Sequence, residues 1–550
     1  MKFDKCLTKV KVFFSKRLDF IFLITIAFVL IFFKVFSLPL IDGDSAFYSK
    51  IAKNILESGN WLTFRYIDPK DVIDKPPLAF WPIAISFKVF GINDFAATIW
   101  HSILAFATVI LVFYIAKELF GRRVAFYSGL VLITSAQFFY QTRIPLQDMA
   151  LTFFISLSLF CFYIFLKYRR ILAYYLFVLF TSLSILVKGP VSIPLIIPVV
   201  LIYLIIQRKL PFENKKDYLI HGLAGIAIFV LLGCSWFIYE YNVLGQPFLN
   251  QYWARNVGRF FKPVDVEFEP KRDFYTLFIY ILATFLPWAG FLYPGIYYLF
   301  KLRKKEYKAE IDFLLVWFFV IIGFFSISGN RKIIRYMLPF FPAISIMVGK
   351  VWNDIFELGK SFPRRILFSG LIITLIVTIP LVSLLIFGTI TKFPEESLAY
   401  LPIFIPFIVS LTIALATFLI FAFCGKLKTA FYTLVILSAI SYMIFINQGA
   451  KYFPLASPYL RFSKKISSML TEKSKVATYK GEFNRFVIFY VDKPVVYLKN
   501  DKELKEFLSS PNRVFVVTDQ KEDFERFRGK NKVYILDSSN NKYLFTNIKL

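Results

Sequence analysis

The sequence predicts a polytopic α-helical membrane protein with a small α/β domain at its carboxyl end. The chain has 550 residues, of which 57% are hydrophobic and 18% are charged, and its mean hydropathy is +0.62. These values depart from those of soluble domains toward those of membrane proteins. A hydrocarbon core about 30 Å thick needs roughly 20 apolar residues per helix. About thirteen such runs follow one another before residue 450.

The apolar runs define the expected membrane spans. They lie at 18–38, 95–116, 124–140, 148–167, 171–187, 190–207, 218–239, 275–300, 311–328, 333–350, 366–389, 401–424 and 429–447. The short connections at 121–123 and 188–190 predict antiparallel hairpins. The basic first seventeen residues precede a run that is too long for a cleaved signal peptide, which indicates a retained anchor.

Lysine and arginine concentrate in alternate loops, which predicts the orientation because short basic loops stay inside the cell. The expected inside loops are 1–17, 117–123, 167–170, 208–217, 301–310, 351–365 and 425–428. The loops at 39–94, 141–147 and 240–274 then lie outside, together with the carboxyl end. The net charge of +29 is explained by this topology and by contact with anionic lipid headgroups. Scattered basic residues do not predict nucleic-acid binding.

The cysteines and histidines of the chain argue against disulfide bonds and against a histidine-rich metal site. The four cysteines fall in the inside tail or within spans, so no disulfide is expected. The chain has only two histidines, His101 and His221, which excludes a histidine-rich metal site.

The expected domains are residues 1–450, which span the membrane, and residues 451–550, which form an outer α/β domain. In the second domain, short β-branched runs at 475–479, 495–498 and 513–518 predict strands. Amphipathic segments at 501–509 and 520–528 predict helices. No glycine-rich phosphate loop occurs there, so a structural or acceptor-presenting role is expected.

The first outside loop, residues 39–94, contains a predicted amphipathic helix. Asp44 occupies the N-cap position, and Gly59 ends the helix. Apolar residues recur with helical spacing at Phe47, Ile51, Ala52, Ile55 and Leu56, and the polar face carries Lys50, Lys53, Asn54 and Glu57. This pattern predicts a helix in the membrane interface. A capping role alone would account for Asp44.

The same loop carries the sequence Asp74-Lys75-Pro76-Pro77. The two prolines are suited to opening a second interfacial helix through Trp81. Lys75 then either extends to lipid headgroups or binds a phosphate, for which an ammonium group is well suited. Residue types alone leave both interpretations open.

Further ionisable residues lie at the expected outer ends of the spans. A charge at the centre of a membrane helix costs about 2.5 to 3.5 kcal/mol on insertion scales, so such residues often mark functional sites, although the cost falls toward helix ends. Each alone could be a cap or an anchor. The group comprises Arg143, Asp148, Lys188, Arg255, Arg259, Arg335 and the neighbouring Tyr336. Acids and bases gathered on one side suit an anionic, lipid-linked substrate.

Three segments of the first loop resemble the N-terminal signature of the GT-C membrane glycosyltransferases, specifically the lipid A aminoarabinose transferase (ArnT) and protein mannosyltransferase-like group. They are Asp44-Ser-Ala-Phe-Tyr48, Glu57-Ser-Gly-Asn-Trp61 and Asp74-Lys75-Pro76. The resemblance continues through Arg143 to Asp148, Lys188-Gly189-Pro190 and Arg335-Tyr336-Met337-Leu338-Pro339. Thirteen spans with an outer α/β domain are also that family's architecture.

The resemblance implies an inverting transferase. It would move a sugar from an undecaprenyl-phosphate carrier to lipid A or another envelope acceptor. The reaction would take place at the periplasmic face of the bacterial inner membrane.

The resemblance also implies roles for individual residues. Asp44 matches the family's catalytic aspartate and would orient or deprotonate the acceptor. Lys75, with Arg259 and Lys188, would stabilise the leaving phosphate. The remaining candidates would position the sugar or the acceptor: Asp148, Tyr48, Tyr66, Tyr336 and Arg143.

Two departures from the family pattern limit what can be transferred. Ser45 stands where the family usually has an acidic residue. The aminoarabinose enzyme has a histidine that helps to bind a metal, and in this chain that histidine is replaced near Asn256. Asp74 is the candidate ligand for a hard cation such as Mg²⁺, and no zinc site is expected. The sugar could therefore be aminoarabinose, a hexose or a uronic acid.

Two other functions remain open. Protein O-glycosyltransferases of the same superfamily would use a protein acceptor. A lipid-linked sugar transporter or flippase would explain many spans, but it predicts internal repeats and midplane charges, and neither is evident in the sequence. A structural scaffold would give no reason for charges on one side.

Overall fold

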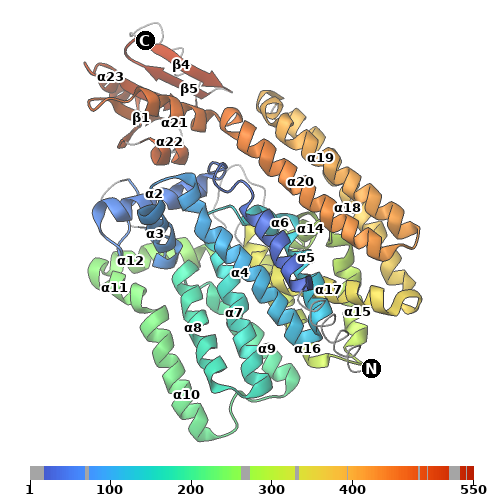
Figure 1. Cartoon of the computed structure of the whole chain (residues 1–550). Coiled ribbons are helices and arrows are strands. Elements are labelled where there is room, and N and C mark those ends of the chain that lie inside the picture. Colours follow the sequence, from blue (N-terminus) through green and yellow to red (C-terminus); the bar gives the residue numbers. More distant parts are fainter. Residues whose placement is uncertain are drawn as a thin grey trace, which may run out of the picture.

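A bundle of long helices carries a small sheet domain at one end. The computed structural model describes residues 18–67, 73–261, 273–328, 333–392, 394–480, 484–491, 493–519, 533–539 and 542–549. Figure 1 shows the sheet domain above α2 (Gly43–Ser58) and α3 (Trp81–Phe90), which lie across the end of the bundle. The first expected outside loop therefore lies between the bundle and the sheet domain.

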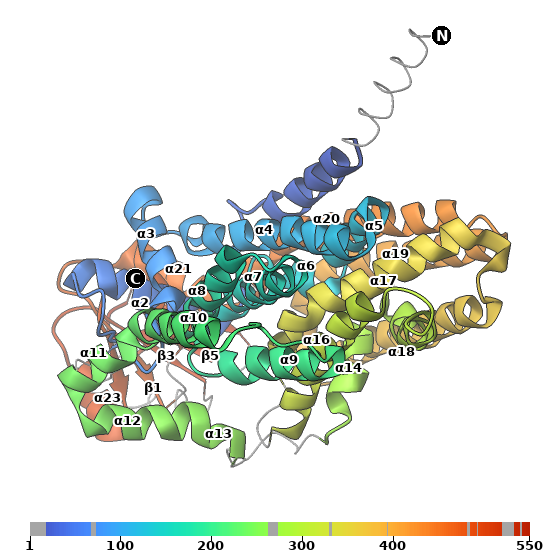
Figure 2. The same cartoon turned by 90° about the horizontal axis from the view of Figure 1, so that it is seen from below.

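The bundle is built from helices that follow one another with short connections. Its first half comprises Leu18–Phe32, α4 (Asp94–Phe120), α5 (Arg122–Ile133), α6 (Ala136–Gln141), α7 (Gln147–Tyr168), α8 (Ile171–Lys188), α9 (Ser192–Gln207), α10 (Lys215–Ile228) and η2 (Phe229–Gly233). Next come α11 (Ser235–Leu244), α12 (Gln246–Tyr252), η3 (Trp253–Val257) and α13 (Gly258–Phe261), which follow one edge of the molecule in Figure 2.

The second half of the bundle contains several interrupted helices. It comprises α14 (Thr276–Thr284), η4 (Ala289–Phe291), α15 (Leu292–Leu302), α16 (Lys308–Ile327), η5 (Ile334–Phe340), α17 (Phe341–Leu358), η6 (Gly359–Ser361), α18 (Arg364–Lys392), α19 (Pro394–Phe423) and α20 (Leu427–Ala456). The predicted span at 275–300 is thus two helices with a turn between them. Pro287 lies in that turn, and it cannot donate the backbone hydrogen bond that a continuous helix needs.

The polytopic helical fold is confirmed. Eight helices among the described residues are long and apolar enough to cross a membrane, as judged by length and composition. Two shorter apolar helices, Leu18–Phe32 and Ser192–Gln207, coincide with expected spans. The count of about thirteen spans is not confirmed.

Both predicted hairpins are present, and a glycine forms the bend in each. Gly121 separates α4 from α5 with a φ of 91°, and Gly189 separates α8 from α9 with a φ of 84°. Both values lie where glycine is strongly favoured over other residues. Deeper in the bundle, Gly349 of α17 packs so closely on α5 that an added Cβ would lie 2.4 Å from Ser128 Oγ. A small residue there allows the two backbones to approach.

The helix of the first loop begins two residues earlier than its sequence predicts. Asp42, with extended backbone, is the N-cap of α2, and its side chain accepts a hydrogen bond from the Asp44 amide at 2.7 Å. The prediction that Asp44 is the cap is therefore wrong. Gly59, with a φ of 69°, ends α2 as predicted. Lys53 was expected on the exposed polar face, but it is buried, and its Nζ lies 3.7 Å from Glu57 Oε1 one turn further along α2.

The proline pair precedes the second helix of the loop. Pro77–Ala79 forms the short turn η1, and α3 begins at Trp81. Trp81 donates its indole hydrogen bond to the carbonyl of Trp61 at 2.6 Å. This contact ties α3 to the segment that follows α2.

The carboxyl-terminal domain is a five-stranded mixed sheet with strand order β2-β1-β3-β5-β4. Its elements are α21 (Pro458–Met469), β1 (Lys475–Tyr479), α22 (Arg485–Tyr490), β2 (Val495–Leu498), α23 (Asp501–Leu508), β3 (Val514–Thr518), β4 (Tyr534–Ser539) and β5 (Lys542–Thr546). The three predicted strands and the helix at 501–509 are confirmed. The helix predicted at 520–528 lies outside the described residues. The antiparallel pair β4–β5 and the short helix α22 were not predicted.

Helix α22 joins the sheet domain to the first loop. The Tyr490 hydroxyl accepts from the Leu40 amide at 3.1 Å and donates to Asp94 Oδ1 at 2.5 Å. Phe489 stacks on Phe87 of α3 with ring centroids 6.3 Å apart. These contacts place the sheet domain and residues 39–94 at the same end of the bundle.

Candidate functional site

The Asp44 carboxylate lies in the first turn of α2, between two arginines from distant parts of the chain. Arg335 of η5 donates to Asp44 Oδ2 at 2.5 Å, and Arg485 of α22 donates to Oδ1. Burial raises the pKa of the carboxyl, but the two guanidinium groups more than offset this, so the pKa of Asp44 lies below its ordinary value. Asp44 is therefore ionised near neutral pH.

Arg335 continues this network into the bundle. Its Nη1 lies 3.7 Å from Asp42 Oδ2, and its Nε lies 3.6 Å from Asp148 Oδ2. Asp148 is buried at the start of α7, and its Oδ1 accepts from Lys188 Nζ at 2.6 Å. The pKa of Asp42 is raised, first by burial and then by the charge of Asp44. Three acids and three bases thus form one cluster at the end of the bundle.

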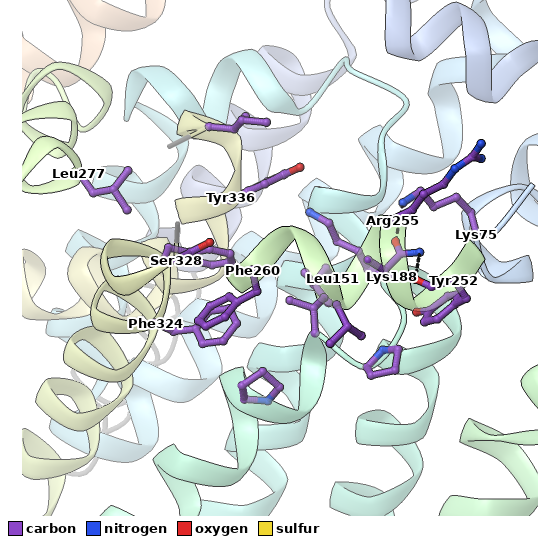
Figure 3. Close-up of a pocket in the computed structure, with 17 residues that line it drawn as sticks. Lys75, Leu151, Lys188, Tyr252, Arg255, Phe260, Leu277, Phe324, Ser328 and Tyr336 are labelled. Atoms are coloured by element: carbon purple, nitrogen blue, oxygen red, sulfur yellow. Dashed lines mark hydrogen bonds between the residues drawn. The ribbon is translucent and has the colours of Figure 1, made fainter. Parts of the chain in front are cut away.

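Lys188 also faces a cavity of about 370 Å³. Its Nζ lies 4.0 Å from the centre of the Tyr336 ring, a cation–π contact. In Figure 3, Lys75, Lys188, Arg255 and Tyr252 lie on one side of this cavity, whereas Phe324 and Leu277 lie on the other. The cavity therefore has a cationic end and an apolar end.

Asn256 of η3 holds two predicted site residues in place. Its Oδ1 accepts from Lys75 Nζ at 2.9 Å, and its Nδ2 donates to Asp74 Oδ2 at 2.6 Å. η3 is a π-helical turn, a feature often found at functional sites. The wider turn directs Asn256 to Asp74 and Lys75, while Arg255 lines the cavity.

The residues around Asp74 fit a divalent cation poorly. Asn256 binds the Asp74 carboxylate with one end of its amide and the Lys75 ammonium with the other. No cluster of three or more His, Cys, Asp or Glu side chains occurs among the described residues. A hard cation prefers several oxygen ligands and is repelled by an adjacent positive charge.

Two predicted tyrosines lie near the cluster, Tyr48 in a buried position and Tyr66 in a half-buried one. Tyr48 stacks on Phe80 at 5.2 Å between ring centroids. Burial, followed by the charges of Asp148 and Asp44, raises its pKa well above the ordinary value. Tyr66 packs on Phe47 at 4.7 Å, and within the described part of the chain its buried hydroxyl makes no hydrogen bond.

Two other predicted residues remain, Arg143 and Arg259. Arg143 is buried against the end of Leu18–Phe32 and lines a different cavity. Its guanidinium lies 4.6 Å from the centre of the Phe139 ring of α6 and makes no ion pair with the cluster among the described residues, so its predicted positioning role stays a prediction. Arg259 belongs to α13, and its side chain lies outside the described residues.

Sequence reasoning missed the contribution of Arg485. This residue lies 441 positions from Asp44 in a helix of six residues that the hydropathy pattern does not reveal. Arg335 was recognised as part of a motif, but its role as the central cation was not. Asn256 was identified as a departure from the family pattern, which was the one available signal for its importance.

Comparisons with known proteins agree with this arrangement. The family model described as dolichyl-phosphate-mannose-protein mannosyltransferase matches residues 74–235. An uncharacterized protein of Aquifex aeolicus is 29% identical over 465 residues, which is 84% of each chain. The undecaprenyl phosphate-alpha-4-amino-4-deoxy-L-arabinose arabinosyl transferase 2 of Proteus mirabilis is 26% identical over 378 residues. That match covers 68% of this chain and 66% of the relative.

The fold extends the similarity further than sequence alone. The crystal structure of ArnT from Cupriavidus metallidurans bound to undecaprenyl phosphate has a TM-score of 0.78 at 17% sequence identity. The match covers 96% of this chain and 98% of that one. At this level of identity the likeness shows the fold: the chain has the fold of the ArnT structure. Its sequence is similar to the arabinosyl transferases and, over residues 74–235, to the mannosyltransferase family model.

Proposed function

We propose that this enzyme transfers a sugar from a polyprenyl-phosphate carrier to lipid A or another cell-envelope acceptor. The observation that carries the proposal is the cavity with apolar walls and a cationic end formed by Lys75, Lys188 and Arg255. An isoprenoid chain suits the apolar part, and a lipid phosphate suits the cations. The ArnT relative of similar fold was crystallised with undecaprenyl phosphate.

The cationic end would stabilise the leaving group. An acceptor oxygen attacks the anomeric carbon, and the bond from that carbon to the carrier's phosphate oxygen breaks. The electron pair departs on the phosphate, whose charge grows in the transition state. Positive groups already held in place lower the energy of that charge. Attack from the opposite face inverts the anomeric centre.

The state of Asp44 favours an acceptor that is already anionic. A carboxylate bound by Arg335 and Arg485, with its pKa below the ordinary value, is a weak base. A hydroxyl acceptor would need a stronger base, whereas a phosphate acceptor needs mainly orientation. This supports the phosphate of lipid A over a protein hydroxyl. Protein O-glycosylation is the second candidate, because the matched family model is described by that activity.

The orientation of the site is part of the proposal. Helix α2 and the sheet domain lie at one end of the bundle, while the basic turn Gly121-Arg122-Arg123 joins α4 to α5. By the positive-inside rule we expect that basic turn to lie in the cytoplasm. Helix α2 lies at the opposite end of the long helix α4, so we expect it on the periplasmic side. We also propose that no divalent cation takes part at Asp74, because its surroundings suit one poorly.

The test is a transfer assay with the purified chain in proteoliposomes. Labelled undecaprenyl-phosphate sugars serve as donors, with lipid A and peptides as separate acceptors and with EDTA in a parallel series. We expect transfer to lipid A, unaffected by EDTA, and a loss of about 100-fold in Asp44→Asn, because an acceptor that is no longer held in the reactive orientation reacts slowly. Glu57→Gln, on the exposed end of the same helix, is the control. Undiminished transfer by a folded Asp44→Asn protein would refute the assignment, and transfer to peptides alone would favour the second candidate.

A further inference from the structure

A second cavity, of about 250 Å³, lies between α6 and the helix pair α19–α20. Figure 1 shows α6 beside α20 on the side of the bundle away from α8. Most of the cavity wall is apolar and includes Leu38, Phe139, Ile403 and Phe445. Its lining residues include one charged group, Arg143, and no carboxylate. Nothing in the proposed transfer reaction uses this space.

Arg143 is buried there, and no carboxylate of the described residues pairs with it. Its side chain is 4% exposed. One nitrogen donates to the Leu30 carbonyl, Nη1 donates to Thr142 Oγ1 at 2.9 Å, and the guanidinium lies 4.6 Å from the centre of the Phe139 ring. Among the described residues no ion pair reaches Arg143, and its Nε is buried without a hydrogen-bond acceptor.

A buried guanidinium that meets only neutral acceptors is unfavourable, because desolvation is not offset by an opposite charge. Arg143 completes the end of the helix Leu18–Phe32 by binding the carbonyl of Leu30, but a neutral donor would also do this. Arg143 is nevertheless a lining residue of a cavity whose walls would accommodate hydrocarbon, so its charge lies at the edge of that space. A ligand that satisfies both features needs an anionic head and an apolar tail.

We propose that this cavity is a second lipid site, which binds the phosphate of an anionic membrane lipid at Arg143 and its acyl chain along the apolar wall. The ligand is a phospholipid from the surrounding membrane, because the cavity lies among the membrane helices. The site is distinct from the donor cavity, and the two share no lining residue. The charges of Asp42 and Arg335 act on Tyr140, which lines the second cavity, so the site lies next to the Asp44 cluster.

Native mass spectrometry of the full chain can measure this binding with phosphatidylglycerol, phosphatidylcholine and inorganic phosphate as probes. We expect the wild type to retain phosphatidylglycerol in preference to phosphatidylcholine and not to bind inorganic phosphate. Arg143→Gln should weaken phosphatidylglycerol binding about tenfold, because the variant loses a hydrogen bond from a charged group to the lipid phosphate. Binding of phosphatidylcholine should not change. Arg123→Gln, at an exposed arginine that pairs with Glu357, is the control.

A second variant keeps Arg143 and fills the cavity. A Cβ at Gly449 would meet only the end of the Leu38 side chain at 3.7 Å, so Gly449→Leu can be accommodated and would extend into the space. We expect it to lose phosphatidylglycerol. Gly222→Leu, where an added Cβ meets nothing within 4 Å, should bind as the wild type does.

Three results would overturn the proposal. They are wild-type affinity in both cavity variants, binding of inorganic phosphate alone, and displacement of phosphatidylglycerol by undecaprenyl phosphate. Lys75→Ala should leave phosphatidylglycerol binding unchanged. The site can therefore be confirmed even if the chain transfers no sugar, because the readout is lipid binding.

Discussion

At the scale of single residues, the charge of Asp44 depends on two arginines that come from different structural units. Arg335 belongs to the bundle, and Arg485 belongs to the sheet domain. Each lowers the pKa of the carboxyl, against the effect of burial. The sheet domain therefore contributes directly to the electrostatics of the proposed catalytic group.

Removal of Arg485 should change the pH dependence of transfer. An ordinary carboxyl has a pKa of about 3.9, and the lowered pKa keeps Asp44 ionised to a lower pH. The stability that its ionised form adds is present above the unfolded pKa and is lost as the pH falls through the folded pKa. In Arg485→Gln the pKa of Asp44 should rise, so kcat/KM should begin to fall at a higher pH than in the wild type. Arg461→Gln, which breaks a pair with Asp537 within the sheet domain, should leave the profile in place. An unchanged acid limb in Arg485→Gln would show that the pair does not control Asp44.

Replacement of Lys75 should weaken donor binding. In Lys75→Ala the cavity loses one of its cations, and Asn256 loses the ammonium that it binds. We expect KM for the donor to rise about tenfold, because a hydrogen bond to a charged group is lost. Lys426→Ala, at an exposed lysine between α19 and α20, is the control. Donor-concentration curves identical to the wild type would exclude a phosphate role for Lys75.

At the scale of elements, the start of α2 determines what Asp44 can do. Asp42 uses its side chain to cap the helix, which leaves the Asp44 carboxylate available to the arginines. If Asp44 were the cap, one of its oxygens would be occupied by the backbone. The shift of two residues thus separates the structural acid from the functional one.

This division of labour predicts different effects of two substitutions at one position. Asp42→Ala removes the cap and should lower the free energy of unfolding by about 1 kcal/mol. Asp42→Asn retains a good capping group and should be more stable than Asp42→Ala, although both lose the weak pair with Arg335. Thermal unfolding of the two variants in detergent measures the difference. Equal stability would contradict the capping role.

At the scale of the whole molecule, the sheet domain is docked on the first loop. Tyr490 binds both Leu40 and Asp94, and Phe489 packs on α3. The site is thereby enclosed between two parts of the chain. The division into residues 1–450 and 451–550 remains a prediction, and α20 continues to Ala456 before α21 begins.

The proposed orientation can be tested by labelling single cysteines in a cysteine-free background. Glu57 at the end of α2 and Glu357 near the end of α17 are both about half exposed and lie in loops predicted on opposite sides. An impermeant maleimide added outside spheroplasts should label Glu57→Cys and not Glu357→Cys. The reverse pattern would invert the topology and remove the site from the periplasm.

The sequence by itself determined the elements that depend on local order. Apolar length indicated a polytopic bundle, helical periodicity and Gly59 indicated α2, and β-branched runs indicated β1, β2 and β3. It also identified Asp44, Lys75, Lys188 and Asp148 as a group on one side, because loop charge and helix ends are local properties. The broken span at 275–300 and the cap at Asp42 escaped it, since packing and turn geometry decide between neighbouring positions.

Only the tertiary structure decided which of these residues meet. Asp44 is joined to Arg335 across 291 positions and to Arg485 across 441, and Lys75 is joined to Asn256 across 181. No periodic pattern encodes such contacts, because they depend on how helices pack. The same packing places Arg143 at a second cavity beside the cluster, where it lines a different space from Lys75 and Lys188. Hydrophobicity along the chain thus determined the fold class, while long-range packing of the helices and the sheet domain determined the site.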